Sequence, residues 1–369
     1  MTGFALGSVG SARTSADSAL SSVGSARSSA DSALSSADSA LSLGHWIRLS
    51  LCLTVIALAF FWSTTALAQS YPTRPITLIV PYPAGGATDV TARVIAAEMS
   101  KHLQQKVIVE NKPGAVGTVG AGFVAKQPPD GYTLLLGGPG NLTLRPLMQP
   151  PLSYDPLRDL ATVNHVANYD HLLVVRNGLG VNSVTELIAL AKSKPGALTF
   201  GSSGTGGPQH MAVELFMLMA GIEMKHIPYK GEAPVVTDLG GERIDVSIIT
   251  ATAIGSFVKE GRVKALAATN PYRSNTFKNL PTVFEAGLPG YEFESYGGIM
   301  APAGTPKAVI DTLNGAIAKA VASPELQQKF LDANLFLLGK GPEEFSKFLA
   351  AERLKWAPII KKAGATDAS

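Results

Sequence analysis

Short hydrophobic runs alternate with longer amphipathic stretches over most of the chain, beginning at residue 76. Runs of this kind, bounded by Gly or Pro, predict buried strands, and they lie at 76–80, 106–110, 132–136, 198–201, 226–229, 244–249 and 263–268. The stretches between them predict helices at 88–102, 117–126, 184–193, 208–220 and 233–239. This alternation predicts an α/β fold with mostly parallel sheets that are covered by helices on both faces.

Residues at the ends of these segments support the predicted helices. Thr88 or Asp89 is positioned to cap the first helix, and Ser183 with Glu186 has the spacing of a capping box. Gly221 is a natural residue to follow the last turn of the helix at 208–220. The tail is predicted to be helical, with helices that open at Thr305-Pro306, Ser323-Pro324 and Pro342, and with Pro358 as a kink or an early end.

Two apolar stretches, 172–175 and 297–300, lack helix signals. We interpret them as crossover strands between two lobes. The first lobe would comprise residues 69–171 plus 293–369, and the second lobe residues 172–292. A chain that crosses twice forms a hinge, and ligands usually bind in the cleft between the lobes.

The first 44 residues differ in composition from everything that follows. Ser, Ala, Asp, Leu and Gly dominate, and Val9 and Arg13 recur as Val23 and Arg27. A later spacing of seven leaves a coiled coil conceivable. However, each repeat has one Leu among many Ser, which favours a low-complexity segment that is disordered or lies upstream of the true start.

Residues 45–68 have the pattern of a signal peptide. His45 and Arg48 precede an apolar run, and Ala66-Leu-Ala68 is a small-residue cleavage site. The run is shorter than the roughly 20 residues of a comfortable membrane span, although a membrane anchor is the alternative. We expect cleavage near Ala68 and export of residues 69–369 to an oxidising compartment.

Composition narrows the function. The net charge of +3 is small and dispersed, which argues against a nucleic-acid partner. Cys52, the one cysteine, lies in the signal-peptide run, so a disulfide framework or a cysteine-based metal site is excluded. The histidines do not have a metal-ligand spacing, and we expect no metal and no cofactor.

A glycine-rich loop, Pro81-Tyr-Pro-Ala-Gly-Gly-Ala-Thr-Asp89, follows the first predicted strand and opens a helix. Its glycines allow close approach of the backbone to a ligand, and unpaired amides at a helix start suit an anion. Asp89 could cap these amides or orient a bound water. The alternative is an ordinary turn between a strand and a helix.

A second loop of this kind, Phe200-Gly-Ser-Ser-Gly-Thr-Gly-Gly207, lies in the predicted second lobe. Two such helix starts in opposed lobes would suit a ligand with two separated carboxylates. Alternatively, the hydroxyl groups bond their own backbone and merely form the turn. A hydrolase is a further alternative, with Ser203 as nucleophile and His210 as base, but Ser203 does not lie in G-x-S-x-G.

Several motifs in order along residues 71–306 are similar to those of a known family. They are Tyr71-Pro-Thr-Arg-Pro-Ile76, Val80-Pro-Tyr-Pro-Ala-Gly-Gly-Ala-Thr-Asp89, Val109-Glu-Asn-Lys-Pro-Gly114, Asp130-Gly-Tyr-Thr-Leu134, His226-Ile-Pro-Tyr-Lys-Gly-Glu-Ala-Pro234, Leu239-Gly-Gly-Glu-Arg-Ile-Asp245, Leu280-Pro-Thr-Val-Phe-Glu-Ala-Gly-Leu-Pro-Gly290 and Ala301-Pro-Ala-Gly-Thr-Pro306. The chain resembles the substrate-binding proteins of tripartite tricarboxylate transporters, the Bug family.

The resemblance implies a two-lobed, type II-like periplasmic binding protein that closes on a small organic carboxylate and performs no catalysis. It implies membrane transporter subunits as partners, although a sensor for a signalling partner is an alternative. We expect a monomer. The first loop would hold a ligand carboxylate through backbone amides and waters, with Tyr82 packed on the ligand. The expected ligand-binding residues are Tyr82, Ala84, Gly85, Gly86, Thr88, Asp89, Gly138, Asn141, Ser202, Ser203, Gly204, Thr205, His210, Tyr229, Lys230, Gly231 and Thr250.

Two positions depart from the family pattern. Arg145 precedes Pro146 where the family often has Asn-Pro, and Ile248-Ile-Thr250 stands where the family often has Phe-Asp-Asn. The second departure removes an acidic residue that could receive an amino group. We therefore expect the ligand to be an acid without an amine and the distal pocket to be less polar than usual.

Overall fold

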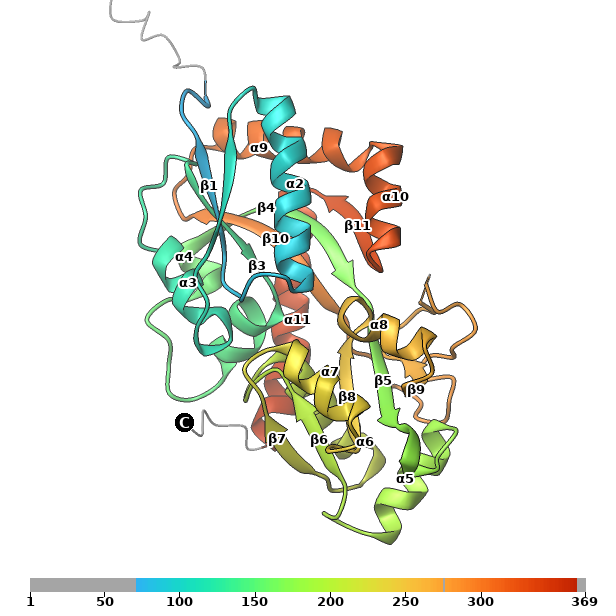
Figure 1. Cartoon of the computed structure of the whole chain (residues 1–369). Helices are drawn as coiled ribbons and strands as arrows, with labels where there is room; N and C mark the ends of the chain where they lie inside the picture. The colour runs from blue at the N-terminus through green and yellow to red at the C-terminus, as the bar shows by residue number, and fades with distance from the viewer. Residues whose placement is uncertain (1–70, 275, 364–369) are drawn as a thin grey trace, which may run out of the picture. The chain divides into compact units, whose positions relative to one another are not determined.

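Six strands form the sheet of the first lobe, in the order β11-β4-β10-β3-β1-β2 (Figure 1). They are β1 (Ile76–Val80), β2 (Val107–Asn111), β3 (Thr133–Gly137), β4 (Leu160–Tyr169), β10 (Ser295–Pro302) and β11 (Leu335–Lys340). Side chains alternate between two buried faces along β1. Leu78 packs with helices α2 (Ala87–Leu103) and α9 (Lys307–Val321), whereas Ile79 packs with α3 (Thr118–Val124) and α11 (Pro342–Ala363). Burial on both faces explains why the run 76–80 is apolar throughout.

The second lobe contains a five-stranded sheet in the order β7-β6-β8-β5-β9. Its strands are β5 (His171–Arg176), β6 (Thr199–Ser202), β7 (Lys225–Pro228), β8 (Val246–Thr250) and β9 (Val263–Ala268). Helices α5 (Val184–Ser193) and α6 (Pro208–Ala220) cover one face, and α7 (Glu232–Gly240) and α8 (Ala251–Lys259) cover the other. Leu173 on β5 faces the first pair of helices and Leu172 the second.

Both sheets are mixed, because the crossover strands enter them antiparallel to their neighbours. Strand β10 is antiparallel to β3 and β4, and β5 is antiparallel to β8 and β9. Strand β11 is also antiparallel to β4, whereas β1 is parallel to β2 and β3, and β6 is parallel to β7 and β8, as the βαβ pattern predicts. The stretches 172–175 and 297–300 do lie in crossover strands, since β4 passes into β5 with only Asp170 between them.

Several helix ends lie where the sequence predicts them. Helix α6 spans Pro208–Ala220, with Gly221 in the left-handed region at its end. At the start of α5 the Ser183 hydroxyl accepts from the Glu186 amide, and the Glu186 carboxylate accepts from the Asn182 amide. Strands β4 and β11 were not predicted from the sequence. The short helices α4 (Pro156–Asp159) and Gly140–Leu144 were not predicted either.

Three predicted helix ends are wrong. Helix α2 begins at Ala87 behind an extended Gly86, so Asp89 lies in its first turn instead of capping it. Helix α9 begins at Lys307, which places Pro306 at the capping position. Helix α11 continues past Pro358 to Ala363, because its packing stabilises the last turns despite the lost hydrogen bond.

The computed structural model describes residues 71–274 and 276–363. The predicted low-complexity segment 1–44, with its alternative coiled coil, and the predicted signal peptide 45–68 lie outside these residues. Within the described ranges, none of the helices has the length and apolar character needed to cross a membrane.

Helix α11 connects the cores of the two lobes. Phe345 and Leu349 near its start are buried in the first lobe between α3 and the sheet. Trp356 and Ile360 near its end are buried with the side chains of α5 and α6 in the second lobe. A short helix, α10 (Pro324–Asp332), precedes β11, and the Ser323 hydroxyl caps it.

Candidate functional site

Asp89 organises the loop between β1 and α2. Its carboxylate accepts hydrogen bonds from the Gly85 amide at 2.9 Å, from Arg93 Nε at 2.9 Å and from Asn111 Nδ2 at 2.9 Å. Burial raises the pKa of this carboxyl, but the bonds from Arg93, Gly85 and Asn111 outweigh burial and leave the pKa below its usual value. Asp89 is therefore ionised and holds the loop through these bonds. The Gly85 amide is already bonded to this carboxylate.

Tyr82 and Asn141 connect this loop to the segment after β3. Asn141 Nδ2 donates to the Tyr82 hydroxyl at 3.2 Å, and Asn141 Oδ1 accepts from the Gly138 amide at 3.2 Å. The Tyr154 hydroxyl donates to the Asn141 carbonyl at 2.7 Å, which fixes the backbone there. Burial raises the pKa of Tyr82, so the phenol is neutral. The structure thus brings together Tyr82, Gly138 and Asn141, as the resemblance implies.

The loop after β6 rests on two stacked histidines. The rings of His210 and His226 lie 4.0 Å apart with an interplanar angle of 13°. His210 Nδ1 accepts from the Gly206 amide at 2.9 Å, and His226 Nε2 lies 2.7 Å from the Ser202 hydroxyl. Burial lowers the pKa of His226 to about 4, with a further contribution from His210. Both imidazoles therefore bond to this loop, His210 to the Gly206 amide and His226 to the Ser202 hydroxyl.

Three loops of the second lobe share a hydrogen-bond network. The Ser203 hydroxyl donates to Gln209 Oε1, and Gln209 Nε2 donates to Glu232 Oε1 at 2.7 Å. Glu232 Oε2 accepts from the Thr250 hydroxyl at 3.0 Å, and Glu232 Oε1 also accepts from the Thr250 amide at 3.3 Å. Burial raises the pKa of the Glu232 carboxyl, against the opposing effect of these donors. The network links Ser203 to Thr250 through Gln209 and Glu232. We call Ser203, Glu232 and Thr250 the second-lobe wall.

Glu232 provides an acidic side chain beside Thr250 that the expectation of a less polar distal pocket did not include. That expectation rested on the position beside Thr250 on the same strand, where Ile249 stands in place of the acidic residue that the family often has. The structure supplies a carboxylate to Thr250 from the first residue of α7 instead. The signal was present in Tyr229-Lys-Gly-Glu232, where an acidic residue follows the loop directly.

The other predicted residues differ in their placement. The Gly231 amide donates to the Ser203 carbonyl at 3.3 Å, so these two loops touch. The Tyr229 hydroxyl donates to Asp238 at 2.8 Å on α7, and Lys230 is exposed. Ser202 is buried, and its hydroxyl bonds the Gly204 carbonyl, which is the turn-forming alternative. Ala84, Gly86 and Thr205 are exposed or half-buried in the loops, and Thr88 is half-buried in the first turn of α2.

Residues of the first lobe contact the start of α6 in the second lobe. A methyl group placed on Gly207 would lie 3.4 Å from Val116 Cγ1, and one on Gly206 would lie 3.2 Å from Arg145 Cδ and 3.1 Å from Met148 Sδ. Val116 also lies against Gly140, beside the Tyr82 hydroxyl. The loop 200–207 therefore lies close to residues of the first lobe that follow β2 and β3.

The hydrolase alternative lacks its expected pair. Ser203 donates to Gln209, and His210 bonds the Gly206 amide on one side and lies 3.3 Å from Glu214 on the other.

Within residues 71–274 and 276–363, no group of three or more His, Cys, Asp or Glu side chains is arranged to hold a metal ion.

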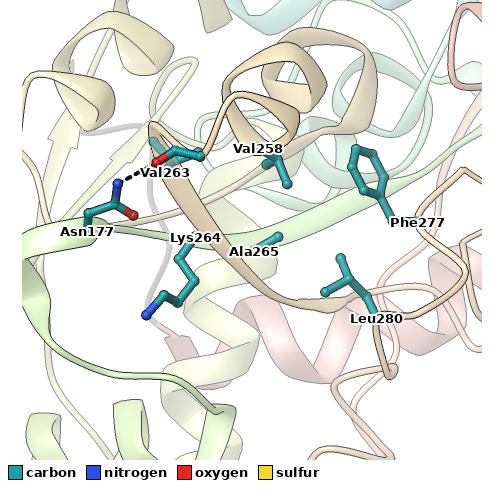
Figure 2. A pocket seen from close by; sticks show the side chains of 8 residues that line it. Asn177, Val258, Val263, Lys264, Ala265, Phe277 and Leu280 are labelled. Atoms are coloured by element: carbon teal, nitrogen blue, oxygen red, sulfur yellow. Dashed lines mark hydrogen bonds between the residues drawn. The ribbon is translucent and has the colours of Figure 1, made fainter.

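Two hollows lie away from these loops. One, of about 330 Å³, lies beside the edge strand β9, where Phe277 and Leu280 face Val258 and Ala265 (Figure 2). Asn177 donates to the Gly261 carbonyl at its rim. The other, of about 390 Å³, is lined by residues of β4 and β11 together with Tyr272, Glu294 and Phe348. Neither hollow includes a predicted ligand-binding residue.

The two lobes, their crossover strands and the joined loops define the class of periplasmic binding proteins, and solved structures agree. R. palustris Rpa4515, solved with adipate, is 36% identical with a TM-score of 0.76, and the match covers 80% of this chain and 99% of that one. MatC from Rhodopseudomonas palustris, solved with bound malate, is 28% identical with a TM-score of 0.73, over 79% of this chain and 100% of that one.

The family follows from sequence. The model of the tripartite tricarboxylate transporter family receptor matches residues 91–365, and the chain belongs to this family. Protein BugT of Bordetella pertussis is 36% identical over 299 residues, which is 81% of this chain and 92% of BugT. A UPF0065 protein from the tcbD-tcbE intergenic region of Pseudomonas sp. strain P51 is 36% identical over 308 residues, 83% of this chain and 91% of that protein. The resemblance to the Bug family is confirmed.

Proposed function

We propose that this protein is a periplasmic receptor that captures a small organic carboxylate between its lobes and delivers it to a membrane transporter. The observation that carries the proposal is the close approach of the two lobes at the loop 200–207, where a methyl group on Gly206 would meet Arg145 and Met148 and one on Gly207 would lie near Val116. Family members solved with adipate and malate support a carboxylate as the ligand.

The arrangement explains how a carboxylate would be held with a small net charge. Helix α6 begins immediately after Gly207, and Pro208 at its first position leaves the following amides directed toward the loop. The partial positive charge of a helix start favours an anion. Arg145 adds a cationic side chain that is buried beside Gly206. Local amides and one guanidinium, more than the charge of the whole molecule, would therefore bind the acid.

Closure of the lobes is the proposed transport signal. The chain passes between the lobes along β4–β5 and β9–β10, so small changes at these crossovers would change the separation of the loops. A ligand that touches both loops binds the closed form better than the open form, and it shifts the population accordingly. A transporter subunit that contacts both lobes would then distinguish the loaded receptor from the empty one.

A thermal-shift screen of the purified protein tests the proposal. Mono-, di- and tricarboxylates are compared with their uncharged amides, and hits are measured by calorimetry. A carboxylate at about 100 times its Kd should stabilise the protein by about 2.7 kcal/mol, whereas its diamide should not. The proposal is wrong if no carboxylate stabilises the protein, or if the protein turns over its ligand and Ser203→Ala abolishes that turnover.

A further inference from the structure

We propose that Glu232 makes the second-lobe wall of the binding site select a monocarboxylate whose far end carries a hydrogen-bond donor, in preference to a dicarboxylate of equal length. This inference rests on the proposed function, because it assigns the chemistry of one end of the same site. Glu232 was not among the residues expected from sequence. Its importance follows from the direction of the hydrogen bonds around it.

The carboxylate of Glu232 fixes the orientation of Gln209. An ionised carboxylate only accepts hydrogen bonds, so the side-chain nitrogen of Gln209 must face Glu232, at 2.7 Å. The amide oxygen of Gln209 then faces Ser203 and accepts its hydroxyl proton. Ser203 consequently has no proton left to offer a ligand. Its oxygen presents only lone pairs, and lone pairs accept hydrogen bonds and repel a carboxylate.

Glu232 also fixes the direction of the Thr250 hydroxyl. Its hydroxyl proton is directed at Glu232 Oε2 at 3.0 Å, and its oxygen accepts from the Ala253 amide at 3.3 Å. Thr250 thus caps helix α8 and at the same time donates to the carboxylate. Neither hydroxyl of this wall, from Ser203 or from Thr250, can donate to a bound acid while Glu232 is ionised.

The two ends of the site therefore have opposite character. Beside Gly206 the first lobe contributes the cationic side chain of Arg145, which suits a carboxylate. On the wall formed by Ser203, Glu232 and Thr250 there are acceptors and one negative charge. The side chain of Glu232 is half-buried, and its carboxylate accepts from Gln209 and Thr250. A ligand end with a hydroxyl, an amide N–H or an ammonium group pairs with this wall, whereas a second carboxylate is repelled.

Binding of matched ligands to the wild-type protein tests this directly. Calorimetry compares dicarboxylates of four and six carbons with their monoamides, with the ω-amino acids and with the plain monocarboxylates of the same length. We expect the donor-bearing acid of the better length to bind about tenfold or more tightly than the dicarboxylate, since a hydrogen bond to a charged group replaces a repulsion. A dicarboxylate that binds more tightly than every donor-bearing acid of its length overturns the inference and leaves the proposed function intact.

Glu232→Gln assigns the selectivity to this carboxylate. The neutral amide can donate, so Gln209 is free to turn and Ser203 recovers its proton for a ligand. We expect the preference to fall to about onefold or to reverse, by the same hydrogen-bond argument. Glu260→Gln, which removes an exposed carboxylate at the end of α8, should keep the wild-type preference. An unchanged preference in a folded Glu232→Gln protein contradicts the inference. If the wild-type protein binds none of these carboxylates, the proposed function itself is wrong.

Discussion

Two glycines with similar backbone angles have very different surroundings. Gly206 has a φ of +73° and Gly180 a φ of +76°, a region that disfavours any residue with a Cβ. A methyl group on Gly180 would meet nothing within 4 Å, whereas on Gly206 it would press on Arg145 and Met148 of the first lobe. The pair separates the cost of backbone strain from the cost of disturbing the contact between lobes.

Gly206→Ala should therefore weaken ligand binding, and Gly180→Ala should not. Both variants should lose roughly 1 kcal/mol of stability, because alanine is strained at a positive φ. Only the added methyl at 206 holds the lobes apart, so we expect its Kd to rise about tenfold or more, as for a loss of about 1.4 kcal/mol. Urea unfolding and calorimetry measure the two effects. Equal Kd values for the two variants would show that the contact at Gly206 has no part in binding.

Sequence could place these loops but not the bonds within them. The glycines and hydroxyls of 81–89 and 200–207 indicate ligand loops because they follow strands and open helices. The sequence places Glu232 directly after a predicted ligand loop, but its bonds could not be predicted, because its partners Gln209 and Thr250 are distant in sequence and meet only when α6, α7 and β8 pack. The stacking of His210 on His226 depends on the same packing.

Helix α11 contributes to two hydrophobic cores, and its side chains show this by their burial. Trp356 is 1% exposed and packs with the second lobe, while its indole N–H donates to Glu352 at 3.0 Å. Leu354, two residues earlier, is 78% exposed. The helix therefore offers a large buried side chain and a large exposed one within the same turn.

Trp356→Ala should cost about 3–5 kcal/mol of unfolding free energy, because it leaves a large cavity and removes the indole N–H that donates to Glu352. Leu354→Ala on the exposed face should change stability by less than about 0.5 kcal/mol. Urea unfolding followed by circular dichroism measures both. A similar small loss for the two variants would mean that the end of α11 contributes little to the core of the second lobe.

Elements with local signals were the ones predicted most accurately. Helix α6 carries a starting proline and a terminal glycine, and strand β9 is an apolar run interrupted only by Lys264, so both agree with prediction. Strand β4 was missed because Asn164, His165 and Asn168 interrupt its hydrophobic pattern. These polar side chains are buried only because β10, β11 and α11 surround the strand, which is tertiary information that no local pattern contains.

At the scale of the whole molecule, three histidines with lowered pKa values make folding sensitive to pH. Burial lowers the pKa of His165, of His171 and of His226 to about 4 in each case, from 6.5. They lie in β4, β5 and β7, so both lobes contain at least one. Between pH 6.5 and 4 the unfolded chain binds protons at these sites that the folded protein does not. Stability from the neutral histidines is thus complete above pH 6.5 and is lost as the pH falls toward 4.

Replacing His171 isolates this effect from the carboxyl groups, some of which titrate in the opposite sense. His171 is 1% exposed, and its Nδ1 donates to the Tyr169 carbonyl at 3.1 Å. His171→Phe keeps the ring against Phe293 and removes one titrating site. We expect the loss of unfolding free energy between pH 7 and pH 4.5 to be smaller than in the wild type by about 1–3 kcal/mol. Urea unfolding at half-unit pH steps measures the difference.

His102→Phe, at the end of α2 on the surface, should leave the wild-type dependence unchanged. Parallel curves for His171→Phe and the wild type would show that His171 titrates alike in the folded and unfolded chains, and the acid sensitivity would then have to come from the remaining histidines in β4 and β7.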